Sequence, residues 1–197
     1  PSARADSTFD LTADWSDAAN PSGPWALRAG PVILPRALNW QNTGQDGWAT
    51  SSTGHDYLPF WFKQTIPSLG IDTLPGDVVV HTTDAFNGIG NGPAIVAFTS
   101  PVSGSATISG TIWQARDIGR SNHWSLILTH GGAPLTIAFG DISAANTSRA
   151  NPATFSVPAP ISSGDEVQIL LQETSPGSAG DFVGLTLHLS VASCYPN

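Results

Sequence analysis

The chain has no methionine, one cysteine and one lysine among its 197 residues. Without methionine, residue 1 is not a translation start, which predicts a processed chain whose signal peptide has been removed. The cysteine, Cys194, has no partner for a disulfide within the chain, and a chain of this length buries enough surface to fold without one. We expect Cys194 to be a half-buried terminal thiol, with a link to a second chain as the alternative.

Charge is also scarce. Charged residues make up 11% of the sequence, less than half of the roughly 25% typical of soluble domains. Seven basic residues face fifteen acidic ones, which gives a net charge of -8. Binding to nucleic acid or to an anionic membrane rests on clustered Lys and Arg, so both partners are disfavoured. No apolar run approaches the ~18 residues of a membrane span. Together with many hydroxyl residues, this composition predicts a secreted, extracellular or cell-surface bacterial protein.

The motifs of common enzyme classes are missing as well. The segment "GIGNGP" lacks the G-x-G-x-x-G spacing, and no helix is predicted after it. There is no phosphate-binding loop, no H-E-x-x-H and no G-x-S-x-G. A glycosidase needs two carboxyl groups on either side of one bond. Glu166 and Glu173, the only glutamates, are an odd number of residues apart on one predicted strand and so point to opposite faces. We therefore expect a non-catalytic protein, with a glycan-active hydrolase or lyase that uses an Asp pair as a third alternative.

What the sequence does contain is regular alternation. Sixteen prolines and twenty glycines separate short apolar segments, with no sustained helical period. This predicts an all-β fold, a sandwich or barrel, and most simply a sandwich of two antiparallel sheets with short edge strands and long loops. In the second half, every other residue is apolar, as expected when one face of a sheet is buried. The residues expected to point inward are Ile108, Ile112, Trp124, Leu126, Leu128, Leu135, Ile137, Phe139, Val167, Ile169, Leu171, Val183, Leu185, Leu187, Leu189 and Val191.

The first half is less regular. Pro31 and Pro35 interrupt the apolar segment 25–40, and proline is confined to edge strands, so short edge strands are expected there. Residues 58–64 and 76–83 are better strand candidates. Residues 1–8 form a polar N-terminal arm, and residues 9–197 are expected to form one sandwich domain.

Four segments occur in a recognisable order: "NPSGPWALRAG", "PGDVVVHT", "AIVAFTSPVSGSATISGTIWQARDIG" and "ATFSVPAPISSGDEVQILL". Over residues 9–191 the chain resembles the β-sandwich module common in secreted bacterial proteins that carry a PEP-CTERM sorting signal. Phe98 and Thr99 stand where the pattern often has a tryptophan and a threonine, so Phe98 is a departure from it. The resemblance implies a jelly-roll-like, galactose-binding-like sandwich that is secreted and usually non-enzymatic.

The segment "HTTDAFNGIGNGP", residues 81–93, joins two predicted strands and is too long for a tight hairpin. A Gly-rich connection that uses Asn and Gly for positive φ is the favoured interpretation. A structural calcium ion is the alternative, because Asp84 and the nearby amides supply oxygen ligands, with Asp56 or Asp72 completing the set. The five histidines have no zinc-ligand spacing. We predict no cofactor.

Aromatic side chains give the clearest indication of binding, since a flat sugar face stacks on Trp or Tyr. By alternation Trp113 lies opposite Ile108 and Ile112, so it is expected to be exposed or covered by another chain. Trp61 is expected to point outward with Lys63. Trp48 and Tyr57 lie in the polar loop 43–59, where they could reach a ligand.

Two functions remain open. The first is a carbohydrate-binding module, in which the aromatic residues stack on sugar rings and polar side chains bind hydroxyl groups. Its predicted ligand-binding residues are Trp48, Asp56, Tyr57, Trp61, Asp84, Asn87, Asn91 and Trp113. The second is a self-assembling subunit of an extracellular matrix, filament or surface layer, in which the arm 1–8 pairs with the sheet edge of a neighbouring copy.

Overall fold

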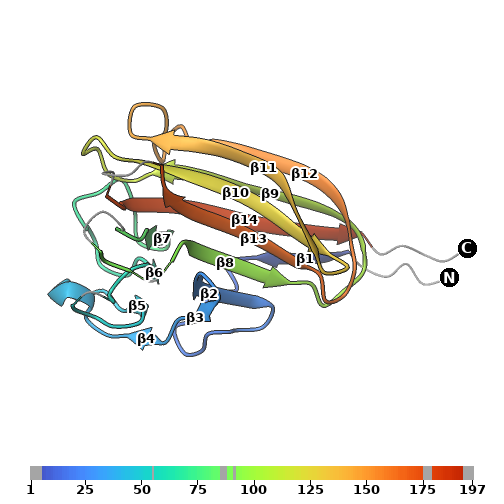
Figure 1. Cartoon of the computed structure of the whole chain (residues 1–197), viewed down its shortest axis with the longest axis horizontal. Coiled ribbons are helices and arrows are strands. Elements are labelled where there is room, and N and C mark those ends of the chain that lie inside the picture. The colour runs from blue at the N-terminus through green and yellow to red at the C-terminus, as the bar shows by residue number, and fades with distance from the viewer. Residues whose placement is uncertain (1–5, 55, 85–87, 91, 175–178, 193–197) are drawn as a thin grey trace, which may run out of the picture.

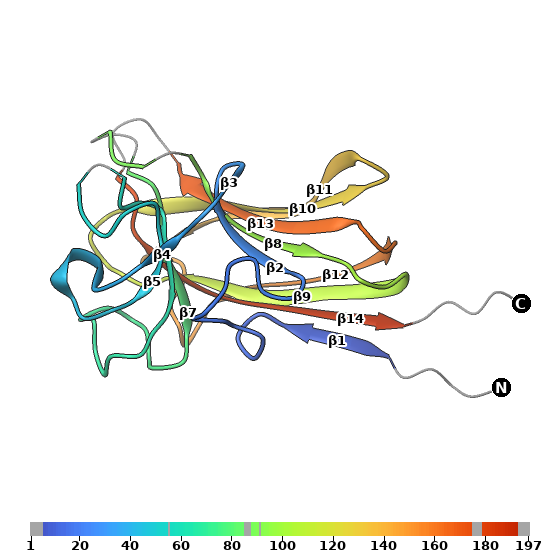
Figure 2. The same cartoon turned by 90° about the horizontal axis from the view of Figure 1, so that it is seen from below.

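The chain folds into two antiparallel β-sheets that pack face to face (Figures 1 and 2). The computed structural model describes residues 6–54, 56–84, 88–90, 92–174 and 179–192. Sheet A has eight strands, in the order β12-β9-β14-β7-β6-β5-β4 with β1 paired to β14, and sheet B has six, in the order β11-β10-β13-β8-β2-β3. The predicted two-sheet antiparallel sandwich is confirmed.

The long strands all lie in the second half of the chain, where the sequence alternates most cleanly. The first half supplies short strands and one 3-10 turn, as the prolines there indicate. The elements are β1 (Ser7–Asp10), β2 (Trp25–Ala29), β3 (Val32–Ile33), β4 (Arg36–Ala37), η1 (Trp40–Asn42), β5 (Gly47–Trp48), β6 (Phe60–Lys63), β7 (Val78–His81), β8 (Ala94–Thr99), β9 (Gly104–Gln114), β10 (Ser121–His130), β11 (Ala133–Ser143), β12 (Ala153–Ile161), β13 (Glu166–Glu173) and β14 (Phe182–Ala192).

Most connections cross from one sheet to the other. The chain passes from β7 in sheet A to β8 in sheet B, back to β9 in sheet A and on to β10 in sheet B. Such alternation between layers is typical of a jelly roll. It also explains the length of the segment after His81, because this segment spans the edge of the sandwich instead of closing a hairpin. The predicted ends of the flanking strands, His81 and Ala94, are confirmed.

The main core lies between the sheets and consists of the inward-facing side chains of the long strands. Ile108, Ile112, Trp124 and Phe98 belong to it, and so do all five predicted inward residues of β14. Leu126, Val167 and Ile169 have no exposed surface. A fully buried aliphatic side chain contributes about 1.5–3 kcal/mol relative to an exposed one, so this layer is the main source of stability.

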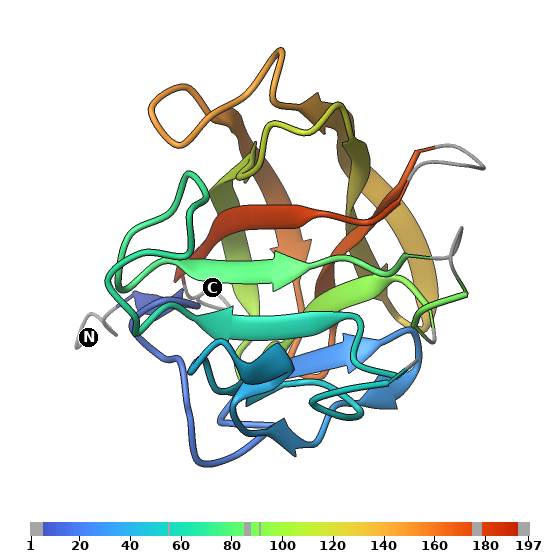
Figure 3. The same ribbon diagram turned by 90° about the vertical axis from the view of Figure 1, so that its left-hand side faces the viewer.

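A second core lies on the outer face of sheet A, at the end of the sandwich remote from β1. We define it as Ala37, Trp40, Ala49, Leu58, Phe60, Phe62 and Val79. The ring of Trp40, from η1, stacks on Phe60 with the centroids 4.5 Å apart and the planes within 3°. Figure 3 shows β6 and β7 running across this end. Strands covered on both faces have continuous apolar runs instead of alternation, as "FWF" and "VVV" do here.

Strand β11 departs from the prediction. Leu135 and Phe139 were expected inside, but their side chains are 64% and 70% exposed. The pairing of β11 with β10 skips Ile137, so a β-bulge there shifts the alternation by one residue. Phe139 consequently shares the outer face with its partner Ser125. Leu135 shares the inner face with Leu128, but it lies near the end of an edge strand where little covers it.

The two ends of the described chain lie side by side. Ser7 pairs with Val191, and Asp10 pairs with His188, so β1 extends its own sheet next to β14. Residues 7 and 8 of the predicted arm therefore belong to a strand, while residues 1–5 and Cys194 lie outside the described residues. Among the described residues, no helix is long and apolar enough to span a membrane.

Candidate functional site

The predicted sugar-stacking tryptophans are buried. Trp61 has no exposed surface and belongs to the main core, between Trp48 and Val80 on the neighbouring strands. Its predicted outward orientation is wrong because the outer face of β6 is occupied by Phe60 and Phe62 of the second core. A ring enclosed in this way has no face to offer to a sugar.

Trp113 is on the predicted face of β9, but it is only 4% exposed. Its indole ring covers Gly184 on β14, and its Nε1 donates a hydrogen bond of 2.9 Å to the carbonyl oxygen of Asp72. The segment that contains Asp72 thus covers the tryptophan. Neither solvent nor a second chain is needed to explain its position, so the predicted exposure is wrong.

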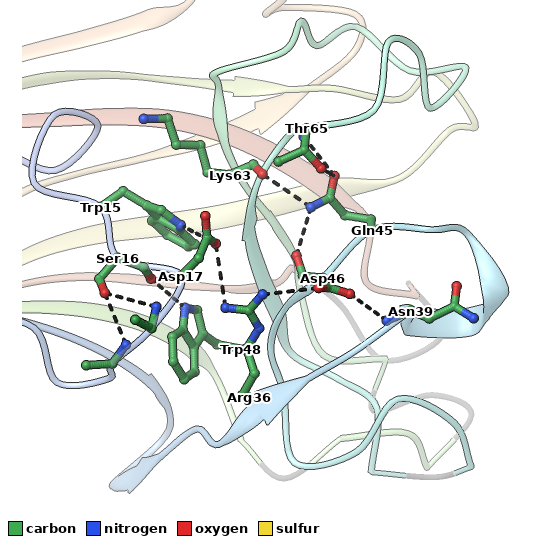
Figure 4. Close-up of polar contacts among 12 residues, drawn as sticks. Trp15, Ser16, Asp17, Arg36, Asn39, Gln45, Asp46, Trp48, Lys63 and Thr65 are labelled. Atoms are coloured by element: carbon green, nitrogen blue, oxygen red, sulfur yellow. Dashed lines mark hydrogen bonds and ion pairs between the residues drawn. The ribbon is translucent and has the colours of Figure 1, made fainter.

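Trp48 is 4% exposed and is held by a polar cluster at the edge of sheet A (Figure 4). Its Nε1 donates to the carbonyl oxygen of Ser16 at 3.2 Å. The guanidinium carbon of Arg36 lies 5.6 Å from the centroid of the Trp48 ring, within the range of a cation–π contact. Arg36 also lies 3.1 Å from Asp46 and 3.9 Å from Asp17. These contacts fix the loops to the sheet, so Trp48 serves the structure.

The other predicted ligand-binding residues do not form one site. Tyr57 is half-buried and packs against Trp40 with the centroids 5.6 Å apart. Asp84 is 7% exposed and forms a backbone bridge with Ile89. Asp56 is exposed. Asn87 and Asn91 lie outside the described residues. In the described part of the chain, no three His, Cys, Asp or Glu side chains gather in a way that could hold a metal ion.

A different site is present on the outer face of sheet B. A shallow groove of about 410 Å³ lies across the start of β10 and the end of β13, lined by Ser121, His123, Asp141, Gln172, Glu173 and Thr174. His123 is centred between Asp141 on β11 and Gln172 on β13, its partners in the two ladders. Its Nδ1 lies 2.8 Å from Oδ1 of Asp141. The hydroxyl groups of Ser121 and Thr174 are 2.7 Å apart.

Apolar side chains border this groove on one side. Phe139, Ser125 and Leu170 form the next row across the same face. The Phe139 ring lies 6.1 Å from the ring of His123, tilted by 34°. Leu170 packs against Ile95 and Ala97, a small cluster on the outer face of sheet B. The site therefore joins an exposed aromatic ring to a set of polar side chains with hydrogen-bonding capacity.

Below the groove, a buried polar network anchors the start of β10. Asn122 has no exposed surface. Its Oδ1 accepts from the Thr82 hydroxyl at 2.8 Å, and its Nδ2 donates to Oε1 of Gln114 at 2.9 Å. The Thr82 hydroxyl in turn accepts from the backbone N–H of Asp181 at 3.0 Å. The network ties the start of β10 to Gln114 of β9 and, through Thr82, to the residue just before β14.

Burial raises the pKa of the Asp181 carboxyl beside this network, although the N–H of Phe182 and the charges of Arg116 and Arg120 oppose the shift. The side chain of His81, at the end of β7, is also buried, and burial shifts its pKa. Burial lowers the pKa of His81 to about 4, and the contact of its Nδ1 with the Thr82 carbonyl only partly offsets this. Both groups are enclosed and belong to the structural interior.

Sequence reasoning missed the groove for one identifiable reason. The alternation of β10 does place His123 and Ser125 opposite Trp124 and Leu126, and so on the outer face. The contribution of β11 could not be found, because strict alternation along this strand puts Phe139 inside. Only the bulge at Ile137 brings Phe139 and Asp141 to the face that carries His123.

No protein-family model matches the sequence, and no curated protein matches it. Solved structures give weak similarities. The chain is similar to the C-terminal CBM6 of LamC, a laminarinase from Zobellia galactanivorans, with 14% identity, a TM-score of 0.34 and coverage of 57% of this chain and 79% of that one. It is also similar to the CBM22-1–GH10 modules of a Clostridium thermocellum xylanase, with 10% identity, a TM-score of 0.39 and coverage of 88% and 27%.

A third similarity is to Eiger TNF from S. frugiperda, with 13% identity, a TM-score of 0.33 and coverage of 51% of this chain and 67% of that one. The three proteins differ in what their names say they do. Likenesses this weak do not show a shared function.

Proposed function

We propose that this protein is a secreted or cell-surface carbohydrate-binding module, of the PEP-CTERM-associated type, that binds a glycan in the groove on sheet B. The observation that carries the proposal is the exposed ring of Phe139 beside a polar groove. Contiguous exposed apolar surface marks interaction sites, and Phe139 lies in one row with Ser125 and the partly buried Leu170 on this face. An aromatic face next to hydroxyl, amide and imidazole groups matches a sugar ring, which has an apolar face and a polar rim.

The chemistry of the groove also limits the class of glycan. Asp141 and Glu173 are two of its six lining residues, and the whole chain has a net charge of -8. Carboxylates would repel a uronic acid or a sulfated sugar. Neutral sugars are therefore the expected ligands, with their hydroxyl groups bound by Gln172 and Ser121.

The test is isothermal titration calorimetry with neutral oligosaccharides, such as gluco-, xylo- and manno-oligosaccharides, beside an anionic oligogalacturonate series. Calorimetry is the right readout because six of the seven tryptophans are buried and would report poorly on binding. We expect binding to at least one neutral series and none to the anionic one. Loss of an aromatic stacking contact costs about 0.5–1.5 kcal/mol, so Phe139→Ala should weaken binding by roughly two- to twelvefold.

Leu38→Ala is the matched control. Leu38 is 61% exposed, comparable to Phe139, and it lies between β4 and η1 in a different part of the fold. This variant should bind like the parent protein. Absence of binding across the neutral panel, or equal weakening by both substitutions, would refute the proposal.

The alternative function, a self-assembling subunit, is supported by the free edge of β11. This edge strand has eleven residues and carries exposed Leu135 and Phe139. Long edge strands with apolar side chains are templates for pairing with another chain. If β11 of one copy pairs with β11 of another, light scattering should show association that increases with concentration. Replacing Leu135 with Lys should abolish that association, while a monodisperse monomer at high concentration would argue against this function.

A further inference from the structure

Three neighbouring side chains on the outer face of sheet B have the arrangement of a nucleophile, a base and an orienting carboxylate. The hydroxyl oxygen of Ser125 lies 3.2 Å from Nε2 of His123. Nδ1 of the same ring lies 2.8 Å from Oδ1 of Asp141. His123 and Ser125 are two residues apart on β10 and therefore share a face. Asp141 reaches this face from β11 through its pairing with His123.

When the His123 ring is neutral, the two contacts favour one tautomer. Ionised Asp141 only accepts hydrogen bonds, so Nδ1 must carry the proton and donate it. Nε2 of the neutral ring then has a free lone pair, to which the Ser125 hydroxyl donates. This is the state in which a histidine can remove the proton from a serine, while the carboxylate orients the ring and stabilises the imidazolium that forms.

Other histidines in the described chain show that an Asp partner alone does not create this arrangement. Nδ1 of His130 lies 2.6 Å from Asp165, and Nδ1 of His188 lies 3.2 Å from Asp10. Neither pair has a hydroxyl hydrogen-bonded to its other ring nitrogen among the described residues. The set Ser125, His123 and Asp141 differs from these pairs because the Ser125 hydroxyl contacts the second ring nitrogen of the histidine. Its surroundings also suit an ester: Phe139 and Leu170 flank Ser125, and the polar groove begins at His123.

We infer that Ser125 is the nucleophile of an esterase site whose substrates are small carboxylic esters. The Ser125 oxygen attacks the ester carbonyl carbon, and its proton passes to Nε2 of His123. The carbon–oxygen bond to the leaving alcohol breaks, and the alcohol departs with that proton. Water then attacks the acyl-serine, again through His123, and releases the carboxylic acid. This activity does not require glycan binding.

Each part of the ester can be assigned to a part of the outer face of sheet B. An apolar acyl chain would lie against Phe139 and Leu170, and a polar alcohol would lie in the groove. The backbone N–H groups of β10 are engaged in ladders with β11 and β13. The carbonyl oxygen would then be stabilised by a side chain, and Gln172, the cross-strand partner of His123 on β13, supplies an amide on this face. With one side-chain donor instead of a pair of backbone donors, turnover is expected to be slow.

The experiment follows release of p-nitrophenol from p-nitrophenyl butyrate by the whole protein, together with labelling by a fluorophosphonate that reacts with activated serines. We expect release above the buffer rate, and a label that peptide mapping places on Ser125. Ser125→Ala should abolish labelling of that peptide. Since general-base assistance contributes roughly 10²–10⁴-fold, His123→Gln should reduce the enzymatic rate at least a hundredfold. Asp141→Asn should reduce both release and labelling.

His130→Gln is the matched control. It removes the histidine of the His130–Asp165 pair, whose other ring nitrogen contacts no serine hydroxyl among the described residues. It should hydrolyse the ester like the parent protein. Thermal unfolding of each variant shows whether it is folded, and Ser125 lies on an outer face where truncation to alanine is tolerated. The inference is wrong if Ser125→Ala releases p-nitrophenol at the parental rate, if the label lies on another residue, or if the parent protein is no faster than buffer. Glycan titrations would stand unchanged in each of these cases.

Discussion

The indole ring of Trp113 occupies the space above the Cα atom of Gly184 on the adjacent strand. A Cβ atom built at Gly184 would lie 2.1 Å from Cζ2 of Trp113 and 2.2 Å from Cε2. Glycine is required at this position because the tryptophan passes directly over the backbone. The pair joins β9 to β14 on the outer face of sheet A, next to the second core.

Gly184→Ala should consequently destabilise the protein, although alanine is otherwise well tolerated. Forcing an extra carbon into a packed region costs about 1–3 kcal/mol, and the rigid indole leaves little room for relaxation. Chemical denaturation should show a lower midpoint with an unchanged slope. Gly54→Ala is a useful comparison, since nothing lies within 4 Å of a Cβ there, although its φ of +85° adds backbone strain. A parental midpoint for Gly184→Ala would contradict the packing.

The pKa of His81 predicts how stability depends on pH. Burial lowers this pKa from its ordinary 6.5 to about 4, so the folded state resists protonation. Between pH 6.5 and 4 the unfolded chain takes up a proton that the folded chain does not, and stability falls as the pH falls. Such a shift corresponds to about 3 kcal/mol lost by pH 4. In His81→Gln, the free energy of unfolding should lose this part of its pH dependence, as measured by denaturation at each pH.

Gln45 should be sensitive to an isosteric change. Its amide nitrogen donates to the carbonyl oxygens of Asp46 at 2.8 Å and Lys63 at 3.2 Å, and its Oε1 accepts from the N–H of Thr65 at 3.0 Å (Figure 4). Gln45→Ala leaves these groups buried without partners, at a cost of about 1–3 kcal/mol. Gln45→Glu keeps the size but places a carboxylate oxygen against two carbonyl oxygens. We expect it to be at least as unstable at pH 7, with partial recovery as the carboxyl is protonated.

Two phenylalanines with opposite surroundings offer a direct comparison. Phe60 has no exposed surface and stacks on Trp40, whereas Phe139 is 70% exposed. Phe60→Ala should cost about 3–5 kcal/mol because it leaves a cavity. Phe139→Ala should change stability by less than about 0.5 kcal/mol. Differential scanning calorimetry of both variants would check this, and a large loss for Phe139→Ala would show that its ring serves the fold.

The fold class followed from the sequence because alternation in β9, β13 and β14 has a single physical explanation. With polar Thr186, His188 and Ser190 between apolar residues, only a sheet buried on one face fits. The same rule gave the wrong face for Trp61 and the wrong exposure for Trp113. In "FWF" both faces are apolar, so alternation carries no information about which face is inner. For Trp113 the face was right, but its cover comes from the distant residue Asp72.

The candidate site was out of reach for a related reason. Its residues come from three strands, β10, β11 and β13, and their meeting depends on register. One extra residue in β11 decides whether Phe139 and Asp141 face solvent or core. No feature of the local sequence around Ile137 predicts this shift in register.

The pairing of Ser7 with Val191 also affects the order in which the molecule can form. Among the described strands of this fold, β1 is synthesised first and its partner β14 is synthesised last. Until then β1 has no ladder to join, and sheet A stays in two parts, β12 with β9 and β7 with β6, because β14 is the strand that joins them. Pairings so distant in sequence are slow to close. The nascent chain should therefore stay open until synthesis has passed residue 191, and a chain released before that point should be an easy substrate for proteases.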